Sequence, residues 1–251
     1  MKRNHLLLAI ASIAIASLLC SCSGADKKAA AQAALDIAEA RASALARNVN
    51  PNTLRYAAAN DTLGAPAAAR AVLFGDSITD GWPRKRPAFF SDNGIVGRGI
   101  GGQTSYQFVL RFGADVIGID PEVVVINYGT NDIAMNSGPY VEEETFRNVR
   151  AMCAMAKAAG IKVILASTLP HKGFGWRPEV TDAMPKVVHL NSLVKEYAAE
   201  NGIPYVDYYS AMVSEDGTQM RPELSGDGVH PNEDGYAIME SLVLPVINSL
   251  R

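Results

Sequence analysis

Short apolar runs alternate with longer stretches of helical periodicity over most of the chain. The apolar runs predict strands at residues 71–74, 95–98, 123–127, 162–167 and 204–207. The longer stretches predict helices at residues 104–117, 141–159, 185–201 and 232–250. The runs at 123–127 and 162–167 are apolar on both faces of the pleat, as central parallel strands require. This alternation predicts an α/β fold with a doubly wound parallel sheet.

The N-terminus has a different pattern. Five residues containing Lys2 and Arg3 precede an apolar run of 14 residues, 6–19, which is typical of a signal peptide and too short to span a membrane. The sequence around Cys20 and Cys22 resembles a bacterial lipobox, with Cys22 as the acylated residue. The alternative is an ordinary secretory signal with incidental cysteines. We therefore expect an exported lipoprotein that a lipid anchors to a membrane, in the periplasm or at the cell surface.

The segment after the signal is rich in alanine and poor in large apolar residues. It predicts a helical or frayed tether, and Leu54, Tyr56 and Leu63 could dock a short helix that follows it. The predicted organisation is a signal peptide at 1–21, a tether at 22–49 and one domain at 50–251.

Composition and charge narrow the classes of partner. The chain has 251 residues, 48% hydrophobic and 20% charged, which suits one well-buried domain. Without Lys2 and Arg3 there remain 21 basic and 26 acidic residues, a net charge of −5. This balance and the absence of a basic stripe argue against nucleic acid as a partner. Cys153 would be the only thiol outside the leader, so a buried inert cysteine is expected and a disulfide framework is excluded.

Polar and glycine residues follow four of the predicted strands. Ligands of doubly wound sheets bind outside the carboxyl ends of the strands, so these residues should converge in space. They are Gly75, Asp76 and Ser77; Gly101, Gly102 and Gln103; Gly129, Thr130, Asn131 and Asp132; and Pro170 and His171.

A serine needs a base to become a nucleophile, so the histidines decide whether Ser77 can react. His5 lies in the leader, and His189 lies on a helix face. His171 could line a pocket, but its nearest acidic neighbour along the chain, Glu179, is eight positions away. In "DGVHP", Asp227 precedes His230 by three residues, so one loop can present both groups. Taken alone, this motif could equally be a turn before a helix.

A serine that attacks a carbonyl carbon also needs donors for the oxyanion of the tetrahedral intermediate. The backbone N–H of Ser77, the backbone of Gly102 and the side-chain amide of Asn131 are the candidates. Gly101 is an alternative to Gly102, because the two glycines are adjacent.

Together these blocks resemble the SGNH or GDSL hydrolase family: "GDSIT", "RGIGGQTS", "GTND" and "DGVHP" occur in the family's order. The resemblance implies a flavodoxin-like three-layer α/β/α domain with about five parallel strands. It implies a Ser77–His230–Asp227 triad and an oxyanion hole from Ser77, Gly102 and Asn131. No metal or organic cofactor is implied.

The blocks are shared by esterases of many substrates, so the substrate must be argued from other features. A lipoprotein tether and the aromatic residues on candidate pocket loops favour a small acyl group, acetyl above all, on an O-acetylated glycan. The candidate pocket residues are Asp76, Trp82, Tyr128, His171, Phe174 and Trp176; local packing is the alternative for each aromatic residue, above all for Trp82. The other hypotheses are a lysophospholipase or thioesterase for longer acyl chains, and a non-catalytic binding lipoprotein.

Overall fold

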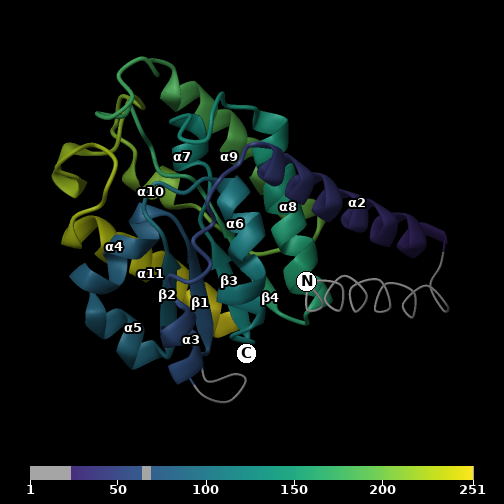
Figure 1. Ribbon diagram of the computed structural model, residues 1–251. Coiled ribbons are helices and arrows are strands. Elements are labelled where there is room, and N and C mark those ends of the chain that lie inside the picture. The colour runs from purple at the N-terminus through teal and green to yellow at the C-terminus, as the bar shows by residue number, and fades with distance from the viewer. Residues whose placement is uncertain (1–23, 64–68, 251) are drawn as a thin grey trace.

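A computed structural model describes residues 24–63 and 69–250 of the chain. Its centre is one sheet of five parallel strands in the order β2-β1-β3-β4-β5 (Figure 1). The strands are β1 (Ala71–Gly75), β2 (Ile95–Gly99), β3 (Val123–Ile126), β4 (Lys162–Ala166) and β5 (Tyr205–Val206). Each strand begins and ends within one residue of its predicted bounds. The predicted parallel α/β fold is therefore confirmed.

The middle of the sheet is its most buried part. Every residue of β1 and β3 is buried, whereas β4 begins at the exposed Lys162. The chain runs from β1 outward to β2 and then returns to the other side of β1 for β3. This reversal is the switch point of a doubly wound sheet, where the strand ends leave a crevice for a ligand.

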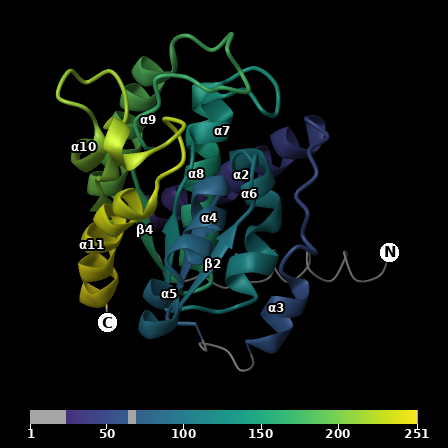
Figure 2. The ribbon, with the colours of Figure 1, turned by 90° about the vertical axis from the view of Figure 1, so that its left-hand side faces the viewer.

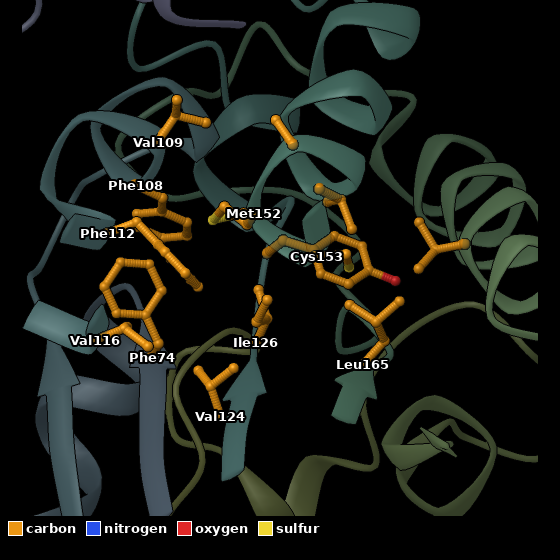
Figure 3. Close-up of a cluster of buried hydrophobic side chains, with 14 of the residues drawn as sticks. Phe74, Phe108, Val109, Phe112, Val116, Val124, Ile126, Met152, Cys153 and Leu165 are labelled. Atoms are coloured by element: carbon orange, nitrogen blue, oxygen red, sulfur yellow. The ribbon is translucent and has the colours of Figure 1, made fainter. Parts of the chain in front are cut away.

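Helices cover both faces of the sheet (Figures 1 and 2). One face packs against α6 (Ser105–Phe112), α8 (Glu142–Ala158) and α9 (Ala183–Glu200), and the other against α4 (Ser77–Lys85), α5 (Pro87–Asn93) and α11 (Glu233–Ser249). Each face of the sheet has its own hydrophobic core, and successive side chains of β1 point alternately into one core and the other because the strand is pleated. Figure 3 shows the first core, in which the Phe74 ring lies 5.4 Å from Phe108 and 5.3 Å from Phe112 between centroids.

Three of the four predicted helices occur within two residues of their predicted ends, as α8, α9 and α11. The fourth, predicted as one helix over 104–117, divides into α6 and a π-helical turn, η1 (Gly113–Ile117). The apolar pattern does not predict α4 and α5, because each has fewer than ten residues and contains a proline. Three further short helices are α7 (Thr130–Ile133), α10 (Tyr208–Met212) and the 3₁₀ helix η2 (Pro222–Leu224).

The alanine-rich segment forms α2 (Gly24–Ala46), which packs along α8 (Figure 1). Ala40 and Ala44 are fully buried, because their small side chains permit close helix packing. Asp36 accepts hydrogen bonds from the Arg150 guanidinium of α8 at 3.1 and 3.2 Å. The predicted helix is therefore present. Its residues 25–32 are exposed, but its C-terminal half is docked on the domain and is not a free tether.

The predicted signal peptide and Cys22 lie outside the described residues. Across residues 24–63 and 69–250, none of the helices combines the length and hydropathy that a bilayer crossing needs.

Residues 47–63, which include the short helix α3 (Ala57–Thr62), contact β2 at the edge of the sheet. The Tyr56 hydroxyl donates to the carbonyl oxygen of Gly99, and Leu63 packs against the core. Leu54 is 81% exposed, so the prediction that it docks this segment is wrong. Docking uses polar contacts instead, including a 2.9 Å bond from Gln103 Nε2 to the Pro51 carbonyl.

Candidate active site

Ser77 begins α4 directly after β1 and lies at the carboxyl edge of the sheet. Asp76 caps this helix, with Oδ1 accepting from the Ile78 N–H at 2.9 Å. The turn requires close contact between α4 and β2: a Cβ on Gly99 would lie 2.1 Å from the backbone nitrogen of Asp80. Only glycine leaves room for this contact, which places the start of α4 above the strand ends.

His230 contacts Ser77 although 153 positions separate them in the sequence. The Ser77 Oγ lies 2.8 Å from His230 Nε2, and His230 Nδ1 lies 2.7 Å from Asp227 Oδ2. The structure thus brings together the three residues predicted as a triad in one hydrogen-bonded chain. In that arrangement a carboxylate holds the imidazole so that Nε2 faces the hydroxyl.

The Asp227 carboxylate is held by its own loop. Its Oδ1 accepts from the backbone N–H groups of Val229 at 2.9 Å and His230 at 2.8 Å. Partial burial would raise the pKa of Asp227, but the hydrogen bonds from the His230 backbone, its imidazole and the Val229 N–H hold this pKa well below its ordinary value. The carboxylate is therefore ionised at neutral pH and can stabilise a protonated His230.

Asn131 lies in α7, directly after β3, and is buried. Its Nδ2 donates to the Gln103 carbonyl at 3.1 Å and to Asp76 Oδ2 at 3.3 Å, so it faces the residue that precedes Ser77. Gly102 has a φ of +76°, a conformation that favours glycine. Both predicted oxyanion residues therefore lie at the edge that holds Ser77, and the choice between Gly101 and Gly102 stays a prediction.

A buried arginine that the sequence analysis did not identify supports these strand ends. Arg111 of α6 donates to the Gly75 carbonyl at 2.7 Å, to Gln103 Oε1 at 2.6 Å and to the Arg98 carbonyl at 3.0 Å. It therefore joins the ends of β1 and β2 beside the nucleophile block. The signal was present in the sequence: an arginine on an apolar helix face, four residues before Asp115, with which it pairs at 2.9 Å.

The residues predicted to contact substrate fall into two groups. Asp76, Trp82, Tyr128, His171 and Phe174 are buried, whereas Trp176 is 43% exposed. Trp82 stacks on Tyr236 and Phe89 and donates from Nε1 to Glu240 Oε1 at 3.1 Å. The prediction that Trp82 lines a substrate pocket is therefore wrong, because its ring is enclosed in the core between α4 and α11.

Tyr128 and His171 are also part of the interior. Tyr128 packs in the core, and His171 Nε2 lies 3.1 Å from the Thr130 hydroxyl. Burial lowers the pKa of His171 to about 3, so this imidazole is neutral at ordinary pH. Of the aromatic residues predicted on pocket loops, Trp176 alone presents a large open surface; its ring centroid lies 6.2 Å from that of His230.

Cys153 is buried and its pKa is raised to about 12 by burial, as expected for an inert thiol. Within residues 24–63 and 69–250, no group of three or more His, Cys, Asp and Glu side chains gathers in a way that could hold a metal ion.

The parallel α/β/α sandwich with a Ser–His–Asp chain at its carboxyl edge is the architecture of a hydrolase. The chain belongs to the GDSL-like lipase/acylhydrolase family, whose model matches residues 73–238. It is therefore a hydrolytic esterase. Two solved structures agree with this assignment over 80% of the chain. A candidate acylhydrolase from Bacteroides fragilis NCTC 9343 is 51% identical, with a TM-score of 0.78 over 98% of its length. A GDSL-like lipase from Bacteroides thetaiotaomicron VPI-5482 is 48% identical, with a TM-score of 0.78 over 99% of its length.

More distant relatives differ in what they are named for. The chain is 27% identical to the uncharacterized lipoprotein YqeF of Bacillus subtilis (strain 168), over 61% of this chain and 75% of that one. It is 23% identical to an acetylxylan esterase of Xylanibacter ruminicola, over 72% of this chain and 43% of that one. It is 24% identical to thioesterase 1/protease 1/lysophospholipase L1 of Escherichia coli (strain K12), over 74% of this chain and 89% of that one.

Asp76 generates a prediction about pH. Burial raises its pKa from 3.8 to about 6, so between these values the folded chain keeps a proton that the unfolded chain has released. The free energy of unfolding should therefore fall by about 2 kcal/mol as the pH rises from 4.5 to 7.5. In Asp76→Asn this fall should be absent. Urea unfolding at pH 4.5 and 7.5 measures it, with the exposed Asp92→Asn as control; equal pH dependence in wild type and Asp76→Asn would contradict the prediction.

Proposed function

We propose that the chain is a serine esterase that removes small acyl groups, mainly acetyl, from carbohydrates. The observation that carries the proposal is the hydrogen-bonded chain from Ser77 through His230 to Asp227, with distances of 2.8 and 2.7 Å. Membership of an acylhydrolase family supports the reaction type.

In the first half of the proposed reaction, His230 Nε2 takes the proton of Ser77 as Oγ attacks the acyl carbonyl carbon. The carbonyl oxygen becomes an oxyanion, for which the Ser77 N–H, the Gly102 N–H and Asn131 Nδ2 are the donors. When the tetrahedral intermediate collapses, His230 gives its proton to the leaving alcohol and the acyl group stays on Ser77.

In the second half, water replaces the alcohol. His230 takes a proton from this water, which attacks the acyl-enzyme, and the carboxylic acid leaves as Ser77 recovers its proton. Through both halves the ionised Asp227 balances the positive charge that appears on His230. The chemistry needs no group beyond these side chains and backbone donors.

Two observations favour a carbohydrate as the alcohol. The exposed Trp176 lies beside His230, and the flat face of an indole is suited to stacking on a sugar ring. The acetylxylan esterase relative is named for an acetylated glycan. The second candidate is a lysophospholipase or thioesterase, which the Escherichia coli relative favours.

We further propose that Cys22 carries a lipid that anchors the exported enzyme to a membrane. The lipobox-like sequence supports this, as does the lipoprotein relative YqeF.

The proposed triad predicts the effect of single substitutions. Ser77→Ala and His230→Ala should each lower kcat on p-nitrophenyl acetate by at least about 10⁴-fold, because the nucleophile and its base act only as a unit. Asn131→Ala should lower kcat by roughly 100- to 1,000-fold, the usual cost of one oxyanion donor. The exposed Ser91→Ala is the control. Activity retained by Ser77→Ala, or covalent labelling of that variant by a fluorophosphonate probe, would refute the nucleophile.

Acyl length separates the two candidate substrates. We expect rates on p-nitrophenyl esters from C2 to C12 to be greatest at C2 to C4, and acetate to be released from acetylated xylo-oligosaccharides. Fatty-acid release from lysophosphatidylcholine is the parallel assay. A rate maximum beyond C6 would reject the acetylesterase and favour the lysophospholipase or thioesterase.

If Cys22 carries a lipid, the full-length protein expressed in bacteria should incorporate labelled palmitate. The labelled protein should also sediment with the membrane fraction. The Cys22→Ala variant should carry no label and should not sediment with membranes, whereas Cys20→Ala should behave as the wild type. A soluble exported wild-type protein without label would show that the leader is an ordinary secretory signal.

A further inference from the structure

Asn136 lies in the loop after α7 and connects two parts of the site. Its Nδ2 donates to Asn131 Oδ1 at 2.7 Å and to the Gly102 carbonyl at 3.2 Å. Its Oδ1 accepts from Trp176 Nε1 at 3.0 Å. A backbone bond of 3.0 Å, from its N–H to the Asn131 carbonyl, holds the loop in place. One half-buried side chain thus contacts both candidate oxyanion residues and the exposed indole.

The first bond is one of the contacts that orient the Asn131 carboxamide, whose Nδ2 donates to the Gln103 carbonyl and Asp76 Oδ2. A carboxamide has a donor end and an acceptor end of similar shape, so only its neighbours distinguish the two orientations. Asn136 Nδ2 needs an acceptor, and the flipped Asn131 would present an NH₂ group to it. The bond therefore acts with the two Nδ2 acceptors to keep Asn131 Oδ1 on the Asn136 side and Nδ2 on the side of Asp76 and Ser77.

The bond to Trp176 holds the indole beside His230. Trp176 belongs to a row of rings that starts at the buried His171 and passes through Phe174, with centroid spacings of 5.6 and 5.2 Å, and ends 6.2 Å from His230. His230 gives its proton to the leaving alcohol, so the alcohol must lie within hydrogen-bond reach of Nε2. The indole therefore borders the space that the alcohol occupies.

We propose that Asn136 is a positioning residue that couples the oxyanion hole to the alcohol subsite. It holds Asn131 Nδ2 toward the oxyanion and holds Trp176 against the leaving alcohol. The inference rests on the proposed function, and it adds Asn136 to the residues on which the rate depends, although this side chain does not touch the reacting atoms.

The test uses Asn136→Asp, which has nearly the same shape and keeps an acceptor for Trp176 Nε1. A carboxylate has no proton to donate to Asn131 Oδ1, and it attracts Asn131 Nδ2 away from the oxyanion. We expect kcat on p-nitrophenyl acetate to fall by about 10- to 100-fold with KM changed by no more than about twofold, as for loss of a preorganised donor. The Ki of ethylboronic acid, which forms a tetrahedral adduct with Ser77, should rise in parallel.

A double-mutant cycle separates this role from a merely structural one. If Asn136 acts through Asn131, Asn136→Asp should lower kcat by less than about twofold in the Asn131→Ala background, because the oriented amide is already gone. Asn201→Asp is the matched control, since Asn201 caps the far end of α9. Thermal unfolding of each variant checks folding, and Asn136→Ser is a second variant should Asn136→Asp unfold.

Either of two results would overturn the inference. One is that Asn136→Asp has the kcat and the boronate Ki of the wild type. The other is that Asn136→Asp lowers kcat by the same factor in the wild-type and the Asn131→Ala backgrounds. Failure of the proposed function is separately visible, because Ser77→Ala would then keep its activity. If Ser77→Ala is inactive and Asn136→Asp behaves as wild type, the triad stands and only the role of Asn136 fails.

Discussion

The contact between α4 and α11 is the constraint on which the site depends, because Ser77 begins one helix and His230 lies just before the other. The Tyr236 hydroxyl of α11 donates to the Ile78 carbonyl at 2.7 Å, and Lys85 Nζ of α4 donates to the Pro231 carbonyl at 2.9 Å. Glu240 accepts from the Trp82 indole and from the guanidinium of Arg86, which follows α4. These bonds and the stacked rings of Trp82 and Tyr236 hold the start of α4 close to the loop before α11. Ser77 Oγ and His230 Nε2 can therefore form their 2.8 Å hydrogen bond.

The loop after α7 is held by the N-terminal layer. Arg47, which follows α2, donates to the Ser137 carbonyl at 2.9 Å and pairs with Glu144 of α8 at 2.8 Å. Its guanidinium also lies 4.2 Å from the centroid of the Tyr106 ring. The loop that carries Asn136 is thus braced by a residue that the sequence pattern assigns to a tether. The C-terminal end of α2 is consequently joined to the scaffold of the site.

Two aspartates near Ser77 show how the environment shifts the pKa values of identical side chains in opposite directions. Asp227 lies in an open loop with three N–H groups around it, which keep its pKa low. Asp76 is enclosed, and burial raises its pKa to about 6 despite the Ile78 N–H bond. The first is suited to carrying a permanent charge opposite His230, whereas the second serves α4 as a cap and Asn131 as an acceptor.

The sequence by itself determined the strands, the parallel fold and the blocks that meet at the carboxyl edge. Strand periodicity and glycine turns are local, and the strand ends of a parallel sheet must converge whatever the remaining packing. It could not determine which aromatic residues face substrate. Trp82 and Trp176 both follow polar turns, yet the first is enclosed by Phe89 and by Tyr236, more than 150 positions away, and the second is open. Nor could it place α2 on α8 or Asn136 between Asn131 and Trp176. Those contacts join segments from 5 to 114 positions apart, and side-chain burial and hydrogen bonding depend on neighbours that only the folded chain supplies.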